Sequence, residues 1–98
     1  HAGAVEWLAR RGYADCRHVQ HLELGQVRVG DRVVGTLPIS AVAELTAKGA
    51  HYQHLVVPLS SADRGRELSA DELEERGARL EGYTAERVPE STGSGNRP

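Results

Sequence analysis

The residues best suited to chemistry in this 98-residue sequence form a glycine corner, Gly35-Thr36-Leu37-Pro38. Pro38 suits the first turn of a helix, because the N–H that proline lacks would have no intrahelical partner there. A helix N-terminus presents free amides and a partial positive charge, and both favour a bound anion. Because Gly35 has no side chain, a phosphate can approach the backbone amides of Thr36 and Leu37. The corner therefore predicts an anion site, with a purely structural turn as the alternative.

A second candidate is a pair of arginines, Arg64 and Arg66, which flank a glycine in a polar loop. Guanidinium groups hold phosphates through forked hydrogen bonds. If the sheet is parallel, this loop lies on the same side as the glycine corner, because ligands gather beyond the carboxyl ends of parallel strands. The alternative is that the two arginines pair with Asp63, Glu67 or the acidic residues 71–75, and the residue types leave both possibilities open.

Metal binding is weighed because the sequence holds five histidines. Strand geometry places Cys16 and His18 on one face and His21 on the other, and it separates His51 from His54 in the same way. Ligands divided between two faces make a poor zinc site, so we predict no metal and no cofactor. Cys16 also has no glycine elbow or helix N-terminus to lower its pKa, which argues against a nucleophilic role.

The elements that must position these residues follow from hydrophobic spacing and turn residues. The sequence predicts helices over residues 2–11 and 38–48, strands over 16–22, 32–34 and 51–57, and a third helix that begins at a Ser69–Glu72 capping box and runs to Tyr83. This order predicts a small α/β domain with a mostly parallel sheet flanked by helices. Because such domains usually begin with a strand, we expect a first strand before residue 1, which makes the fold minimal Rossmann-like. Residues 1–84 then form one ligand-binding domain, and residues 85–98 a disordered tail.

Composition narrows the class of protein. The net charge is −2, and residues 1–60 carry a net charge of +1 against −3 for residues 61–98, which argues against a general binder of long nucleic acids. A single cysteine excludes an intrachain disulfide, so a reducing cytoplasm is the expected location. No apolar run approaches the length of a spanning helix, which predicts no membrane association. Ninety-eight residues bury only a modest core, and a homodimer would enlarge it.

Several segments together resemble a small CRISPR-associated family from type III systems, of the Csx-type accessory proteins, with a minimal Rossmann-like fold similar to the CARF sensor domains. The resemblance covers roughly residues 1–83. It is carried by His1-Ala2-Gly3-Ala4-Val5-Glu6-Trp7, Gly30-Asp31, Val33-Val34-Gly35-Thr36-Leu37-Pro38, Gly49-Ala50-His51-Tyr52 and Arg64-Gly65-Arg66-Glu67-Leu68-Ser69.

The resemblance implies that a homodimer binds a cyclic oligoadenylate, with the tetra-adenylate as the expected ring size. It also implies ring-nuclease activity, which switches off the antiviral signal by metal-independent attack of a ribose 2′-OH on its own phosphate. In that family the opening helix follows a strand ending in Ser-Arg-His, so His1 matches the histidine and is a candidate acid or base. We assign catalysis to His1, Arg64 and Arg66.

The predicted ligand-binding set consists of Gly35, Thr36, Leu37, Pro38, Trp7 and Ser60. The alternative function is a binding module that sequesters the same ligand without cutting it, and the two functions use the same pocket. A third possibility is an interaction protein of the type III complex that binds no nucleotide.

Overall fold

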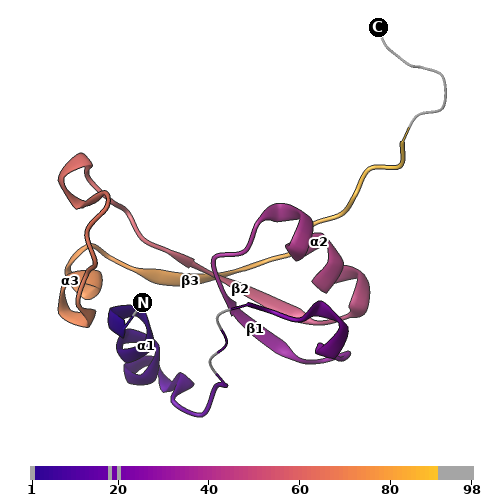
Figure 1. Ribbon diagram of the computed structural model, residues 1–98, viewed down its shortest axis with the longest axis horizontal. Coiled ribbons are helices and arrows are strands. Elements are labelled where there is room, and N and C mark those ends of the chain that lie inside the picture. Colours follow the sequence, from indigo (N-terminus) through magenta and orange to yellow (C-terminus); the bar gives the residue numbers. More distant parts are fainter. Residues whose placement is uncertain (1, 18, 20, 91–98) are drawn as a thin grey trace, which may run out of the picture.

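The computed structural model describes residues 2–17, 19 and 21–90, which fold into a three-stranded sheet with helices at both ends (Figure 1). The strands are β1 (Arg32–Gly35), β2 (His51–Val56) and β3 (Arg79–Tyr83), and the helices are α1 (Ala2–Leu8), α2 (Ile39–Lys48) and α3 (Ala70–Glu75). The π-helical turn η1 (Ala9–Tyr13) extends α1, and two short 3₁₀ turns, η2 (Leu24–Gln26) and η3 (Ser61–Asp63), lie in the connections.

The β1–α2–β2 unit agrees with the sequence prediction. Strands β1 and β2 pair in parallel, with Val33 opposite Tyr52 and Gly35 opposite His54. Helix α2 ends at Gly49, which adopts the left-handed conformation (φ 81°) that glycine tolerates best, and the Gly49 amide donates to the carbonyls at the helix end. The two predicted strands and the helix between them are therefore confirmed, and the structure adds a glycine cap at the end of that helix.

The strand predicted over residues 16–22 is wrong. The described residues of this stretch form no strand, and they lead by an irregular path to η2. The two apolar residues, Val19 and Leu22, are three positions apart, so a strand would turn them to opposite faces. In the structure Leu22 packs against the core beside α2, whereas Val19 is half exposed. The argument that separated Cys16 from His21 by strand geometry therefore no longer applies.

The third predicted helix is too long. Helix α3 ends after one and a half turns because Gly77 turns the chain with a φ of 81°, and the Ala78 amide donates to the Leu73 carbonyl. Residues up to Tyr83 then form β3, which pairs antiparallel with β2. The sheet is therefore mixed, with one parallel and one antiparallel pairing, rather than mostly parallel.

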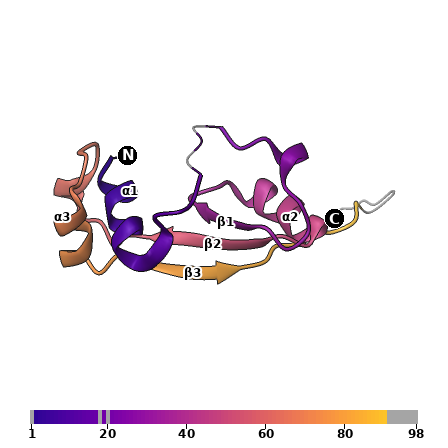
Figure 2. The same cartoon turned by 90° about the horizontal axis from the view of Figure 1, so that it is seen from below.

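Two hydrophobic clusters lie at opposite ends of the sheet, as Figure 2 shows for the helices that form them. Alternation along β2 turns Tyr52 toward α2, where Val42 and Leu45 are buried. It turns Leu55 toward α1 and α3, where Trp7 is buried together with Leu73. Helix α1 lies within the range predicted for the first helix, and Val5 on it is 39% exposed.

The chain after β3 returns to the α2 end. The amide of Ala85 donates to the side-chain oxygen of Thr46 at 3.0 Å, and Ala85 packs against the core beside α2. Residues 91–98, which belong to the predicted tail, lie outside the described residues.

Candidate functional site

The glycine corner lies between β1 and α2, where the sequence predicted it. Pro38 occupies the N-cap position with an extended ψ of 155°, and its carbonyl accepts from the amides of Ala41 and Val42. No side chain caps this helix, so the first-turn amides of Ile39 and Ser40 remain available to a ligand. An added Cβ on Gly35 would meet no atom within 4 Å, which leaves the corner open on that side.

A buried hydroxyl lies directly beneath the corner. Tyr52 is only 4% exposed, and its Oη accepts a hydrogen bond from the Leu37 amide at 2.8 Å and donates to the Gly35 carbonyl at 3.0 Å. Burial raises the pKa of the Tyr52 hydroxyl, although the Leu37 amide opposes that shift. The Tyr52 hydroxyl therefore braces the corner. It also occupies the Leu37 amide, which was predicted to hold phosphate and is bound internally instead.

A polar cluster extends from Tyr52 across the sheet; we call Tyr52, His54, Arg79, Glu81 and Tyr83 the sheet cluster. His54 Nδ1 lies 2.7 Å from Tyr52 Oη, and the His54 ring meets the Tyr83 ring edge-on at 6.0 Å between centroids. Glu81, opposite His54 in the antiparallel register, accepts from Tyr83 Oη and from Arg79 Nε, each at 2.6 Å. These two hydrogen bonds lower the pKa of Glu81, with Tyr83 as the larger cause.

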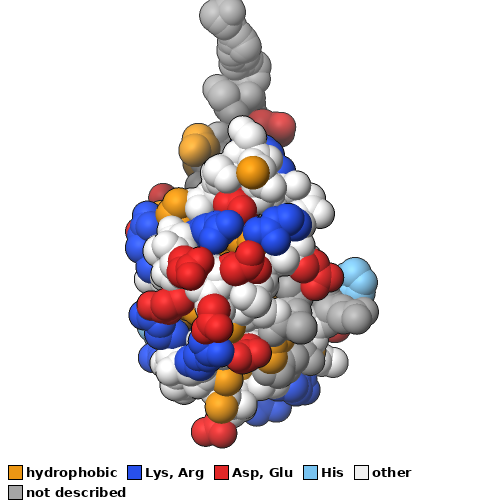
Figure 3. All heavy atoms as spheres, turned by 90° about the vertical axis from the view of Figure 1, so that its left-hand side faces the viewer, with side chains coloured by type: hydrophobic (Ala, Val, Ile, Leu, Met, Phe, Trp, Pro, Cys, Tyr) orange, Lys and Arg blue, Asp and Glu red, His pale blue; other side chains and the backbone are white. Residues whose placement is uncertain are grey.

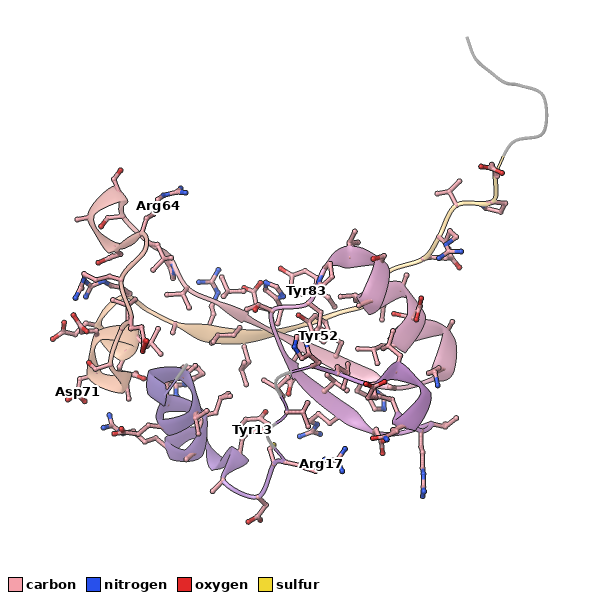
Figure 4. All side chains as sticks on the ribbon, viewed as in Figure 1. Tyr13, Arg17, Tyr52, Arg64, Asp71 and Tyr83 are labelled. Atoms are coloured by element: carbon pink, nitrogen blue, oxygen red, sulfur yellow. The ribbon has the colours of Figure 1, made fainter. Side chains whose placement is uncertain are left out.

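The loop after β2 does not bring the predicted arginines to the corner. Figure 4 places Arg64 beside η3, at the end of the molecule away from Tyr52. Arg66 pairs with Glu72 at 2.9 Å and with Asp63 at 3.5 Å, so for Arg66 the ion-pair alternative is the one observed. Arg64 is exposed and forms no ion pair with the described residues. Figure 3, which faces this end, shows acidic and basic side chains interspersed rather than a basic patch.

Ser60 has a structural partner in the same loop. Asp63 is 4% exposed and accepts hydrogen bonds from the Ser60 amide and hydroxyl and from both Nε and Nη2 of Arg76. Hydrogen bonds hold the pKa of Asp63 far below its usual range. Arg76 is the largest cause of this shift, and the Ser60 amide is the second. The Ser60–Asp63 capping box thus fixes the turn that follows β2.

We expect Asp63→Asn to lower stability at pH 7, with a difference from the wild type that shrinks in acid. A carboxylate whose pKa is depressed by folding contributes fully above its unfolded pKa of about 3.9 and loses that contribution as the pH falls toward its folded pKa. Denaturant titrations at several pH values from 7 to about 3 measure the difference. Glu67→Gln, an exposed carboxylate of the same loop, is the control. A gap that stays constant with pH would contradict this account.

Two residues of the predicted site, His1 and Trp7, belong to the N-terminal segment. His1 lies outside the described residues. Trp7 is 1% exposed, and its Nε1 donates to Glu74 Oε1 at 2.8 Å while the Arg11 guanidinium lies 4.6 Å from its ring centroid. A ligand can reach the Trp7 ring only if α1 moves, so the structure gives this residue a place in the core.

Two hollows lie near Arg32 of β1. One, of about 460 Å³, is lined by Arg32, His51 and Gln53, and the other by Arg11, Tyr13 and Arg32 among others. Neither includes the glycine corner. Within the described ranges, no three His, Cys, Asp or Glu side chains are grouped so as to hold a metal ion. None of the helices described is long and apolar enough to cross a membrane.

Residues 1–86, from α1 through β3, match the model of a family described as "Putative CRISPR-associated protein (Cas_VVA1548)". The chain belongs to this family. No curated protein and no solved structure is significantly similar to it. The match to the Cas_VVA1548 family includes the glycine corner and every residue of the sheet cluster, and it agrees with the CRISPR-associated resemblance seen in the sequence.

Sequence reasoning missed the sheet cluster of this Cas_VVA1548 family member. It compared His51 with His54 as a metal pair, but the informative spacing was between Tyr52 and His54, two residues apart on one strand face. Glu81 and Tyr83 were assigned to a helix, so no reasoning placed them beside His54. The signal available was the alternation of polar residues in Arg79-Leu80-Glu81-Gly82-Tyr83, which is typical of a strand.

Proposed function

We propose that this CRISPR-associated protein is a metal-independent phosphodiesterase that opens a cyclic oligoadenylate and so ends type III antiviral signalling. The tetra-adenylate is the proposed ring size, a homodimer in the cytoplasm the proposed form, and the β1–α2–β2 unit the proposed core of a Rossmann-like, CARF-like domain. Membership of a CRISPR-associated family supports the setting. The substrate and the reaction rest on the resemblance of the sequence motifs.

The reaction requires the protein mainly to position the substrate and to stabilise the charge that develops on it. A ribose 2′-OH attacks the adjacent phosphorus in line, the bond to the 5′ oxygen breaks, and a 2′,3′-cyclic phosphate remains. No water is consumed and no metal is required by this chemistry. The protein must hold the sugar–phosphate in the attacking geometry, supply donors to the phosphate oxygens, and accept the proton of the 2′-OH.

The observation that carries the proposal is the construction of the glycine corner. Its backbone is braced from beneath by Tyr52, and it leads into a helix whose first-turn amides have no side-chain cap. Such amides, together with the helix dipole, favour a phosphate. The side of the corner that a Cβ on Gly35 would occupy is open. These features fit a cyclic phosphodiester held at the surface by backbone donors.

The proposed roles of His1, Arg64 and Arg66 remain predictions. Arg64 has an exposed guanidinium that a phosphate can reach, but it lies far from the corner of its own chain (Figure 4). Arg66 would have to leave Glu72 and Asp63 to contact a ligand. A homodimer is therefore part of the proposal, because a second copy offers the simplest way to bring a cation to the corner.

The decisive experiment incubates excess protein with radiolabelled cyclic tetra-adenylate in EDTA and resolves the products. Linear products that end in a 2′,3′-cyclic phosphate are expected. Intact ligand that co-migrates with the protein would replace the enzyme by a binding module that sequesters the messenger. Intact ligand that stays free would reject both functions and favour a nucleotide-free interaction protein.

Gly35→Ala separates folding from ligand binding. Because the added methyl group meets no atom within 4 Å and the φ of Gly35 is not in the left-handed region, we expect a melting temperature close to that of the wild type. The methyl group would, however, stand where the ligand approaches, so affinity for cyclic tetra-adenylate should fall by about tenfold or more, the equivalent of about 1.4 kcal/mol. Gly25→Ala, equally unobstructed but away from the corner, is the matched control. Unchanged affinity in Gly35→Ala would move the ligand away from this corner.

A further inference from the structure

The hydrogen bonds of the Tyr52 hydroxyl determine which nitrogen of His54 carries a proton. A phenol hydroxyl has one proton to donate and two lone pairs that accept. The Leu37 amide can only donate and the Gly35 carbonyl can only accept, so the Tyr52 proton points to Gly35 O. The 2.7 Å contact with His54 Nδ1 is then a hydrogen bond only if Nδ1 is the donor.

The opposite arrangement brings two acceptor oxygens into contact. If Tyr52 donated to Nδ1, its oxygen would face the Gly35 carbonyl oxygen at 3.0 Å with no proton between them. Tyr52 is 4% exposed, so water cannot readily relieve that contact. Buried polar groups are nearly always hydrogen-bonded, which selects the arrangement in which every partner is satisfied. In the neutral imidazole this leaves Nε2 with a free lone pair.

We propose that His54 is the general base of the reaction and that Tyr52 is a positioning residue that holds it in the Nδ1–H tautomer. The assignment rests on the proposed function, because it takes a cyclic oligoadenylate as substrate. His54 Nε2 accepts the proton of the ribose 2′-OH, and the 2′ oxygen forms its bond to phosphorus. The bond from phosphorus to the 5′ oxygen breaks, and that oxygen takes a proton from water. His54 returns its proton to the solvent, so the net reaction opens the ring without consuming water.

The location of His54 suits this role. Tyr52 contacts both the backbone of the corner and the imidazole, so one hydroxyl sets the position of the base relative to the proposed phosphate site. His54 is partly exposed, which lets a substrate reach the ring. A histidine on the opposite face of β2, His51, has no such link to the corner and provides a built-in comparison.

The charged and titratable groups facing His54 are Tyr52 on its own strand and the β3 members of the sheet cluster. Glu81 lies opposite His54 in the register, and its carboxylate is shared between Arg79 and Tyr83. A carboxylate close to an imidazole stabilises the imidazolium that forms when the base takes a proton. Arg79 balances the charge of Glu81, so the cluster does not repel a phosphodiester as an unpaired carboxylate would.

The test compares His54→Asn with the wild type under single turnover. The asparagine amide can still donate to Tyr52 from the position of Nδ1–H, but it has no basic nitrogen to replace Nε2. We expect a rate at least about 10²-fold lower, the usual contribution of a general base, with affinity for cyclic tetra-adenylate retained. The limb of the pH–rate profile that reports the base should also disappear in this variant. His51→Asn is the matched control and should cleave at the wild-type rate.

Each outcome has a defined meaning. Cleavage by His54→Asn at the wild-type rate would overturn the inference while leaving the phosphodiesterase standing, and loss of ligand affinity alone would make His54 a binding residue instead. A wild type that neither binds nor cleaves would remove the proposed function. The tautomer is tested separately by imidazole ¹⁵N–¹H correlation spectra, in which Nδ1 should carry the proton in the wild type. Tyr52→Phe should lose that preference, and a protonated Nε2 in the neutral wild type would overturn the assignment.

Discussion

Replacing Gly3 by alanine should destabilise the protein, although alanine is the better helix former by about 1 kcal/mol. A Cβ on Gly3 would stand 1.9 Å from the Leu68 carbonyl oxygen and 3.1 Å from the Ser69 carbonyl carbon. These are backbone atoms, which cannot rotate away as a side chain does. The whole of α1 would have to move off the segment that leads into α3. We expect a loss at or above the upper end of the range of about 1–3 kcal/mol for overpacking.

The measurement is the free energy of unfolding from denaturant titration, compared with Gly25→Ala. Gly25 lies in η2 with no atom within 4 Å of an added Cβ and without a left-handed φ, so its replacement should be nearly neutral. If Gly3→Ala instead raised the stability, as helix propensity alone requires, the close approach of α1 to residues 68 and 69 would be refuted.

Trp7→Ala should be the most damaging truncation at the α1 end of the molecule. The Trp7 side chain is 1% exposed and packs in one cluster with Leu73 of α3 and with Ala78, which follows α3. Truncation of a buried tryptophan costs about 3–5 kcal/mol. That is a large part of the total of about 5–15 kcal/mol that stabilises a small domain. We expect Trp7→Ala to be substantially unfolded at ambient temperature or to melt far earlier than the wild type.

Trp7→Phe is the informative companion, because it keeps an aromatic ring in the core but loses the hydrogen bond from Nε1 to Glu74. Arg11 and then Trp7 lower the pKa of Glu74, so the variant should also weaken the link between α1 and α3, with a smaller loss of stability than alanine. If Trp7→Phe were as unstable as Trp7→Ala, the hydrogen bond rather than the packing would dominate.

The same residue tests the prediction that Trp7 contacts the ligand. It is the sole tryptophan of the chain, so its fluorescence reports one position. A ring that stays in the core should show unchanged emission when cyclic tetra-adenylate is added. Quenching or a shift in emission on binding would support the ligand contact that the sequence predicted.

Local signals in the sequence were sufficient for the elements whose causes are local. The Gly35–Pro38 corner and the Ser69–Glu72 capping box each depend on residues a few positions apart. Such features arise from backbone preferences and short-range hydrogen bonds, which do not depend on the rest of the fold. The parallel pairing of β1 with β2 followed from the helix between them.

Features that depend on residues far apart in the sequence could not be predicted in this way. Gly77 can weaken a helix or end it. The helix ends at this point because the following segment, which includes Leu80 and Tyr83, pairs with β2. The polar stretch after Cys16 had partial alternation, but its described residues pair with neither edge strand of the sheet, β1 or β3. Strand formation requires a partner, and a single sequence does not name that partner.

The candidate site likewise has one part that follows from local sequence and another that depends on tertiary contacts. The sequence by itself determined the glycine corner and the helix that follows it, because both arise from adjacent residues. Only the tertiary structure decided that Tyr52 binds the corner from beneath, that His54 is tied to the same hydroxyl, and that Arg66 is held by Glu72 and Asp63. These contacts join residues on different elements, so they depend on sheet register and helix packing, and those are set by the burial of two separate cores rather than by any local pattern.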